Sequence, residues 1–384
     1  MREKIKLLYI ANERIPTDRA NGLQIMKTCE AMAKNGVELE LVIPRRKTEA
    51  MNEDPFDYYK VERVFKLKKL ACLDLIPYLY FLGPIPYWLI SVTFSLSAAF
   101  HSMTHSHDFL YFRHDSILFW FFIFCKKKLI SEFHFLAEKK YQRFFPRLKL
   151  AVAINRSAKE IYQSIKGMKD KVVWAPDGVS IEDFALSITK EDARRKLGLA
   201  VKGRYVVYTG HFYSWKGSDT LIEAAALLPK DITVLLVGGG TPEDSTLLKE
   251  KLPENIILIG QKKYSEIPFY LKAADCLVIT GTAKDEHSNY FTSPLKLFEY
   301  MASGRPIVAS GTSAIQEVLV HKKNSWLVQP DDERALADGI AYIFENPSTA
   351  KLLVEEAKRD VENYTWEKRA KKIISSITTE VRLP

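Results

Sequence analysis

Apolar residues along the first half of the chain fall in short runs separated by amphipathic segments. The apolar run 6–11 leads into a polar loop over 12–21, and Gly22 precedes an amphipathic segment at 23–35. Gly36 closes that segment and a second apolar run follows at 37–43, which together predict a strand–helix–strand unit and a parallel sheet. Further strands are expected at 109–113, 128–133, 150–154 and 172–175.

The second half repeats this alternation with shorter turns. Strands are predicted at 205–209, 233–237, 256–259, 276–279, 306–309 and 325–327. Helices are predicted at 219–228, 245–251, 265–273, 294–301, 314–320, 333–346 and 366–377. Such alternation is typical of a doubly wound α/β domain. Because 384 residues exceed what one core usually organises, we expect two Rossmann-like domains, at 1–182 and 183–365, and a C-terminal segment, 366–384.

Charge and apolar content are unevenly distributed. The net charge is +9, and residues 1–180 hold 29 Lys and Arg against 19 Asp and Glu, so the basic excess lies in the first half. Residues 75–100 carry no charge, but prolines break the stretch and leave only 87–100 as a helix. We therefore expect a buried or membrane-resting segment rather than a membrane span. A basic half can meet an anionic membrane or substrate, and no nucleic-acid-binding signature accompanies it.

The cysteines and histidines indicate no metal site. Four cysteines stand far apart with no CxxC pair, which fits a reduced cytoplasm. His101, His105 and His107 lack carboxylate or cysteine partners in the pattern. The N-terminus runs directly into a strand, so we read no targeting segment and expect a cytoplasmic protein. We expect no metal and no cofactor.

The segment 293–310 carries the strongest chemical signal. Ser293 is a good N-cap and Pro294 suits the first helical position, so a helix is expected to begin abruptly at the carboxyl end of a strand. Its first N–H groups and its dipole favour an anion such as a diphosphate. Glu299 lies one turn further on, with Leu295 and Lys296 on the same helix face. A carboxylate there could accept hydrogen bonds from a ribose diol, although a solvated, capped helix would show the same pattern.

A second segment, 208–217, leaves a strand and enters a helix. Gly210 and Gly217 permit positive φ or a close backbone approach. Lys216 is a cation at the same sheet edge, where it would stabilise the charge that develops on a leaving nucleoside diphosphate. His211 could add a second donor or cation.

These two segments resemble family 4 of the retaining nucleotide-sugar glycosyltransferases, which have the GT-B fold: two Rossmann-like domains that face across a cleft. The resemblance rests on Lys216-Gly217 after a Gly-rich strand end, and on Glu299 followed by Tyr300-Met-Ala-Ser-Gly-Arg-Pro-Ile-Val308. A subset of the family carries Ser-Pro-x-Lys-Leu-Phe-Glu-Tyr-Met-Ala, as this chain does at 293–302. Asp177-Gly178-Val179 is similar to the family's linker turn. Residues 364–370 are similar to its final helix, which crosses back to the first domain.

The resemblance also implies roles for weaker sites. Gly22 would approach donor phosphate and acceptor, His134 would contact a sugar, and Gln261 and Lys262 would hold the nucleobase. Each has a plain reading beside it: a helix start, a structural histidine and an ordinary turn. Two positions depart from the family. Phe291 stands where the family has its first Glu, which contacts donor hydroxyls. His211 stands where it has a phosphate-binding Arg.

The sequence therefore predicts a retaining glycosyltransferase. The first domain would bind a glycan, lipid-linked or small-molecule acceptor, and the second a nucleotide-diphosphate sugar. Peripheral contact with anionic lipid at the inner face of the membrane is expected, and no contact with nucleic acid. Two alternatives remain: a nucleotide-sugar epimerase of the same fold, which needs no acceptor, and a non-catalytic sugar-nucleotide binder, which the substitution at Phe291 would suit.

Overall fold

The computed structural model describes residues 4–46, 53–113, 116–123, 125, 127–239 and 252–379. The chain divides into two units, Met1–Pro176 with Trp366–Pro384, and Asp177–Thr365. It leaves the first unit at Pro176, earlier than the residue 182 expected from the sequence, and returns at Trp366 for its last helix. The helix predicted over 245–251 lies outside the described residues.

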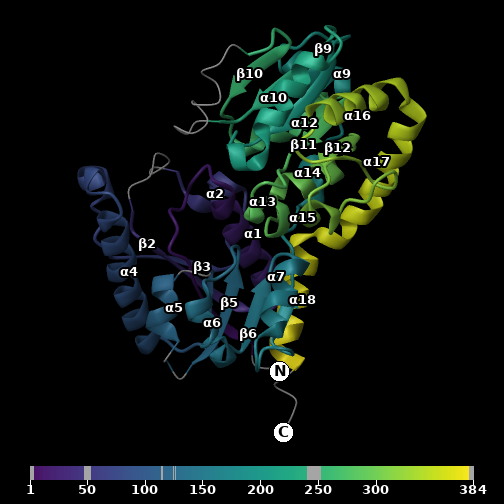
Figure 1. Ribbon diagram of the computed structural model, residues 1–384. Helices are drawn as coiled ribbons and strands as arrows, with labels where there is room; N and C mark the ends of the chain where they lie inside the picture. Colours follow the sequence, from purple (N-terminus) through teal and green to yellow (C-terminus); the bar gives the residue numbers. More distant parts are fainter. Residues whose placement is uncertain are drawn as a thin grey trace. The chain divides into compact units, whose positions relative to one another are not determined.

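A parallel sheet in the order β3-β2-β1-β4-β5-β6-β7 forms the first unit within the described residues (Figure 1). Its strands are β1 Lys6–Ile10, β2 Glu38–Pro44, β3 Lys66–Leu70, β4 Phe109–Arg113, β5 Lys128–Phe133, β6 Leu150–Ala153 and β7 Val172–Trp174. The central strands are almost wholly apolar because helices cover both faces of the sheet. The strand order reverses between β1 and β4, and the carboxyl ends at such a switch point are where doubly wound sheets hold ligands.

Helices of the first unit pack in two groups. They are α1 Ala20–Lys34, α2 Pro55–Tyr59, α3 Ile76–Leu79, α4 Ile85–Thr104, α5 Ser116–Phe122, α6 Lys139–Gln142, α7 Arg156–Ser164 and the C-terminal α18 Trp366–Thr379. Helix α1 packs against α18, and α4 packs against α5. Crossovers from β1 to β2 and from β3 to β4 run in opposite directions, so right-handed connections put α1 and α4 on opposite faces.

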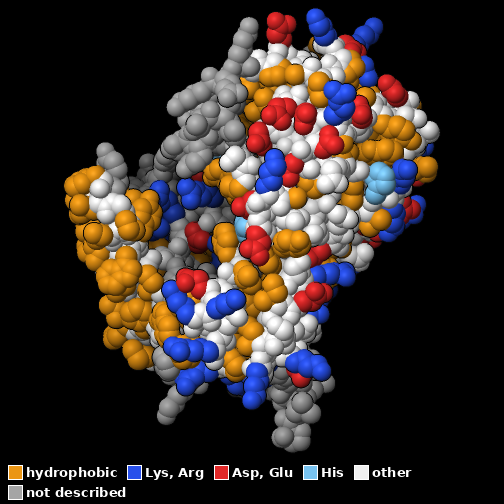
Figure 2. Space-filling model, in the orientation of Figure 1, with side chains coloured by type: hydrophobic (Ala, Val, Ile, Leu, Met, Phe, Trp, Pro, Cys, Tyr) orange, Lys and Arg blue, Asp and Glu red, His pale blue; other side chains and the backbone are white. Residues whose placement is uncertain are grey.

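Helix α4 and the turn before it, η1 Tyr80–Leu82, present many apolar side chains to the surface (Figure 2). Trp88, Leu96, Phe100 and Met103 are 58%, 55%, 67% and 74% exposed. The helix is longer than the 87–100 expected from the sequence, because Pro86 lies in its first turn and does not break it. Among the described helices, none combines the length and the apolar character that a membrane crossing requires.

The second unit is built on a parallel sheet in the order β10-β9-β8-β11-β12-β13. Its described strands are β8 Arg204–Thr209, β9 Ile232–Val237, β10 Ile256–Gly260, β11 Cys276–Ile279, β12 Ile307–Ser310 and β13 Trp326–Val328. Here the switch point lies between β8 and β11. The two segments singled out in the sequence, 208–217 and 293–310, both lie near this switch point.

The helices of the second unit cover both faces of its sheet. They are α8 Ile181–Phe184, α9 Lys190–Lys196, α10 Ser218–Leu227, α12 Ile267–Ala273, α13 Glu286–Tyr290, α14 Leu295–Ser303, α15 Ser313–Gln316, α16 Glu333–Glu345 and α17 Pro347–Val361. One core lies under α10 and α16, and a second lies under α8, α12, α14 and α17. The chain enters the second unit and leaves it in two segments that run side by side. Val179 of the first forms a β-bridge with Thr365 of the second and donates its N–H to the Tyr364 carbonyl at 2.9 Å.

Strand β3 and helix α17 are among the elements that were not predicted from the sequence. Strand β3 reads Lys-Leu-Lys-Lys-Leu, which is polar because it forms the edge of the sheet and only one side of it is covered. Helix α17 follows α16 directly, and Pro347 begins it rather than ending the helix before it. The helix expected at 314–320 is shorter and ends at Gln316.

Candidate active site

Glycines bring two strand ends of the second unit into close contact. Gly210 follows β8 with φ +117° and Gly238 follows β9 with φ +137°, a region that other residues rarely adopt. A Cβ on Gly238 would lie 2.2 Å from the carbonyl oxygen of Gly210. The backbone at the ends of β8 and β9 therefore carries no side chain at either position, and a ligand can approach it closely.

Helix α14 begins at this edge of the sheet, with a different cap from the one expected. Pro294 is the N-cap, with no capping side chain, and Leu295 is the first helical residue. Ser293 was predicted as the N-cap, but its hydroxyl instead accepts a hydrogen bond from the Asp177 N–H at 3.2 Å. The Leu297 N–H donates to the Pro294 carbonyl at 3.0 Å, and because no side chain caps α14, the N–H groups of Leu295 and Lys296 keep their hydrogen-bonding capacity for an anion.

Lys296, in the first turn of α14, reaches the end of β8. Its Nζ lies 3.6 Å from the centre of the Tyr208 ring, and a Cβ on Gly210 would lie 3.2 Å from the same atom. Burial lowers the pKa of Lys296 to about 7, and the nearby carboxyl of Glu299 opposes this lowering. The structure therefore brings together Gly210, Lys296 and Glu299, as the sequence predicted for one sheet edge.

Glu299 is 7% exposed and hydrogen-bonded to the hydroxyl of Tyr264 in η4 Tyr264–Glu266. Burial raises the pKa of Glu299 to about 7; the hydrogen bond from Tyr264 and the charge of Lys296 oppose this, and Asp183 adds to it. Such a carboxyl gains or loses its proton near neutral pH. It is therefore sensitive to any ligand that supplies hydroxyl donors.

Lys216 lies in an aromatic loop next to this edge. Lys216 ends η3 Ser214–Lys216, and Gly217 turns the chain into α10 with φ +67°. Its Nζ lies 4.9 Å and 5.1 Å from the ring centres of Tyr213 and Trp215. His211 stacks on Tyr213 with ring centres 5.3 Å apart. The loop thus holds two cationic or protonatable side chains among aromatic rings.

Helix α13 extends the same cluster. The rings of Trp215 and His287 lie 5.5 Å apart. Burial lowers the pKa of His287; Asp285 opposes this and Lys216 adds to it. Phe291 follows α13 with its side chain buried, 5% exposed, where the family resemblance implied a carboxylate.

Three further residues were predicted for the donor site. Gln261 is exposed and Lys262 half-buried, directly after β10. Gly22 was expected before the helix but lies inside the first turn of α1, because α1 begins at Ala20. A Cβ on Gly22 would lie 2.1 Å from the Tyr59 hydroxyl, so packing against Tyr59 already requires a glycine there.

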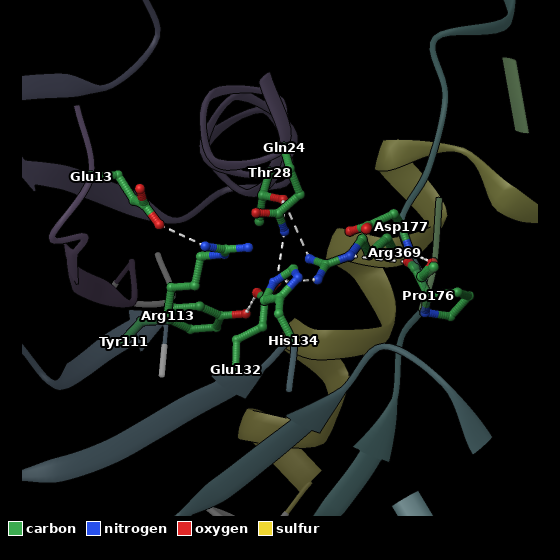
Figure 3. A network of polar contacts seen from close by, with 11 residues as sticks. Glu13, Gln24, Thr28, Tyr111, Arg113, Glu132, His134, Pro176, Asp177 and Arg369 are labelled. Carbon is green, nitrogen blue, oxygen red and sulfur yellow. Dashed lines mark hydrogen bonds and ion pairs between the residues drawn. The ribbon is translucent and has the colours of Figure 1, made fainter. Parts of the chain in front are cut away.

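In the first unit, a buried polar network surrounds the end of β5 (Figure 3). Oε1 of Glu132 accepts hydrogen bonds from Gln24 Nε2 and His134 Nε2, both at 2.6 Å, and from Arg369 at 2.8 Å. The Tyr111 hydroxyl donates to the other carboxylate oxygen. His134 was a candidate from the sequence, but its partners were not, because they come from α1, β4 and α18 and share no local motif with it.

Charge fixes the protonation states of this network. Burial alone would raise the pKa of Glu132, but Arg369 and the hydrogen bonds from His134 and Tyr111 outweigh it and hold that pKa well below its usual range. Burial lowers the pKa of His134 to about 4, and Arg113 adds to the lowering although Glu132 opposes it. At neutral pH the network therefore contains an ionised carboxylate and a neutral imidazole.

The cysteines and the possible metal ligands were also examined for clusters in the part of the chain that is described. Cys29, Cys72, Cys125 and Cys276 are unpaired. Over the described ranges, no group of three or more His, Cys, Asp and Glu side chains is placed to hold a metal ion.

Comparison with known proteins identifies the class of the second unit. Residues 189–360 match the family model described as Glycosyl transferases group 1, so the second unit carries a group 1 glycosyltransferase domain. An uncharacterized glycosyltransferase of Methanocaldococcus jannaschii is 27% identical over 64% of this chain. A D-inositol 3-phosphate glycosyltransferase of Corynebacterium urealyticum is 24% identical over 59%. These alignments span 63% and 55% of the relatives' own lengths.

The whole chain has a solved structural counterpart. HepE of Anabaena, in crystal structures with UDP and with UDP-glucose, superposes with a TM-score of 0.76 at 16% identity and covers 98% of this chain and 100% of HepE. Together with the two doubly wound parallel sheets, this likeness shows that the chain has the GT-B fold.

Proposed function

We propose that this protein is a retaining glycosyltransferase of family 4, which moves a sugar from a nucleoside-diphosphate donor to a glycan, lipid-linked or small-molecule acceptor. The observation that carries the proposal is the geometry at the start of α14. An uncapped helix start, the ammonium of Lys296 and the buried carboxyl of Glu299 gather beside Gly210, in a group 1 glycosyltransferase domain. An anion and a diol on one ligand would fit these groups together.

The donor would bind in the second unit. The first N–H groups of α14 and Lys296 would hold the diphosphate, and Glu299 would accept hydrogen bonds from the ribose. Lys216 and His211 would stabilise the negative charge of the departing nucleoside diphosphate. Gln261 and Lys262 would line the base. HepE is known with UDP and UDP-glucose, and by that likeness we propose a nucleotide sugar as donor here.

The reaction would proceed without a covalent enzyme intermediate. The donor site contains no carboxylate in the place of Phe291, so departure of the diphosphate and attack by the acceptor on the same face would retain the configuration. Donor phosphate would take the proton of the acceptor hydroxyl. Because the ammonium groups and the helix start offset the diphosphate charge, we expect turnover without an added metal ion.

Calorimetry with UDP, GDP and ADP tests the donor site, and a product screen with the matching nucleotide sugars tests turnover. We expect one nucleoside diphosphate to bind and its sugar to appear on an added acceptor with retained configuration. Conversion of the nucleotide sugar in the absence of acceptor would point to an epimerase. Tight binding with no turnover across many acceptors would point to a non-catalytic binder.

We further propose that the first unit rests on an anionic membrane, where a lipid-linked acceptor would lie. The exposed apolar side chains of α4 adjoin the basic edge strand β3, because the Ser97 hydroxyl of α4 donates to the Ala71 carbonyl just beyond β3. Residues 75–105 include no acidic side chain that anionic lipid would repel. Apolar side chains and lysines side by side suit a lipid surface. Flotation with anionic and neutral vesicles tests this, and equal recovery with both would contradict it.

A further inference from the structure

The ring nitrogen of His134 that faces Glu132 must carry a proton. Nε2 lies 2.6 Å from Oε1 of Glu132, and the same oxygen accepts from Gln24 and Arg369. An ionised carboxylate can only accept hydrogen bonds, so Nε2 is the donor. A neutral imidazole has a single N–H. Nδ1 therefore carries a lone pair, and within the described residues it makes no hydrogen bond of its own.

The cation that keeps Glu132 ionised comes from the other end of the chain. Arg369 lies on α18 and is 4% exposed. Besides Glu132, its guanidinium donates to the Pro176 carbonyl at 3.0 Å and to the Thr28 hydroxyl at 3.3 Å. Figure 3 shows the side chain entering the network from α18. Arg369, which lies on α18, thus connects that helix to β5, to α1 and to Pro176, the last residue before the chain enters the second unit.

Without Arg369 the hydrogen bond between Glu132 and His134 would no longer have a fixed donor. Burial raises the pKa of a carboxyl that lacks a cationic partner, and a protonated Glu132 could donate to the ring instead of accepting from it. The imidazole could then take either tautomer. Helix α18 therefore does more than pack against α1, since it decides which ring nitrogen of His134 is available.

We propose that α18 contributes to the site of the first unit. Arg369 and Glu132 are positioning residues that hold His134 as the Nε2–H tautomer. Nδ1 of His134 is then the acceptor for a sugar hydroxyl. This inference rests on the proposed function for its ligand but not for its geometry. The charged groups that act on the ring are Glu132, Arg113 and Arg369, and Tyr111 is hydrogen-bonded to Glu132. They come from β4, β5 and α18, and Gln24 completes the shell from α1.

Nitrogen NMR of the histidine rings tests the inference without any substrate, with the His134 signals assigned from a His134→Gln variant. In the wild-type protein we expect the proton on Nε2 from pH 6 to 9. Arg369→Met should mix the tautomers, because Glu132 without its cationic partner takes up a proton more readily and can then donate to the ring. Arg369→Lys should largely keep the wild-type ring state, which also guards against a failure of the methionine variant to fold.

A matched control lies on the same helix. Lys371 pairs with Glu367 at the surface of α18, so Lys371→Met should leave the ring state unchanged. A proton on Nδ1 in the wild-type protein, or a ring state that does not respond to Arg369→Met, would overturn the inference. Once a donor is known, Arg369→Met should lower kcat/KM by about tenfold, the equivalent of one hydrogen bond. The NMR measurements need no substrate. If the protein proved not to be a glycosyltransferase, they would still show whether Arg369 and Glu132 fix the tautomer of His134.

Discussion

Replacing Glu299 by glutamine tests the donor site most directly. The side chain is 7% exposed, and glutamine keeps its size and an oxygen that can accept from Tyr264, so the fold should survive. What is lost is the charge that would hold the ribose. A hydrogen bond to a charged group is worth about 1.5–3 kcal/mol. The Kd of the nucleoside diphosphate should therefore rise by about 10- to 150-fold.

The pH dependence of binding sharpens the test. Burial raises the pKa of Glu299 to about 7 and lowers that of Lys296 to about 7. The donor needs the carboxylate for its diol and the ammonium for its diphosphate. As pH falls below 7 Glu299 gains a proton, and as pH rises above 7 Lys296 loses one. Affinity should therefore peak near neutral pH and fall on each side by up to about tenfold per pH unit, with apparent pKa values that belong to the pair.

Calorimetry at several pH values, with whichever of UDP, GDP and ADP binds, separates the two limbs. Glu299→Gln should remove the dependence on the acidic side, and Lys296→Met the dependence on the alkaline side. Phosphate groups of the ligand also titrate, but equally for every variant, so ratios to wild type isolate the protein. Glu223→Gln changes an exposed carboxylate on α10 and should leave the curve unchanged. An unaltered Kd in Glu299→Gln, or an unaltered acidic limb, would refute the assignment of Glu299 to the ribose.

Three further outcomes are expected. Lys216→Ala should lower kcat by about 10²–10³ with a smaller change in KM, since stabilisation of a leaving group grows toward the transition state; turnover within about threefold of wild type would remove Lys216 from the mechanism. Gly238→Ala should lower the melting temperature more than Gly198→Ala, because both have positive φ but only the former places a Cβ 2.2 Å from a backbone oxygen; equal losses in calorimetry would show that the strand ends can separate. Phe100→Ser with Met103→Ser should reduce recovery with anionic vesicles without changing nucleoside diphosphate binding, and undiminished flotation would argue against α4 as the membrane contact.

Much of the second unit could be predicted from the sequence because its information is local. Apolar runs of four to six residues between turn residues mark strands such as β8 and β11 to within one residue of their observed ends. The start of α14 at the carboxyl end of a strand also followed from the sequence. Its cap did not, because Ser293 is a good N-cap by type but is held by the backbone of Asp177, 116 residues away in the chain.

The partners of the site residues were beyond reach for the same reason. Tyr264 of η4 is hydrogen-bonded to Glu299 of α14, and Arg369 is hydrogen-bonded to Glu132, 237 residues away in the chain. No spacing rule connects such pairs, because they meet only when the sheet has brought separate strand ends to one edge. A polar residue in a short motif can be recognised as a candidate from sequence, but its protonation state depends on neighbours that only the fold supplies.

Protonation also bears on Phe291, which the family resemblance places in the proposed donor site. With an apolar Phe291 in place of a carboxylate, Glu299 is the buried acid on α14 and Lys296 the ammonium one turn before it. A second carboxylate at this edge would add repulsion to an already costly burial and raise the pKa of Glu299 further. In the proposed donor site a phenyl ring adds no such repulsion, so Glu299 would ionise near neutral pH and the positive charge of Lys296 and Lys216 would remain for a diphosphate. Phe291 therefore changes how the sugar would be held more than how the nucleotide would be held. Phe291→Glu is accordingly expected to weaken nucleoside diphosphate binding rather than to improve it, and tighter binding in calorimetry would contradict this account of the charges.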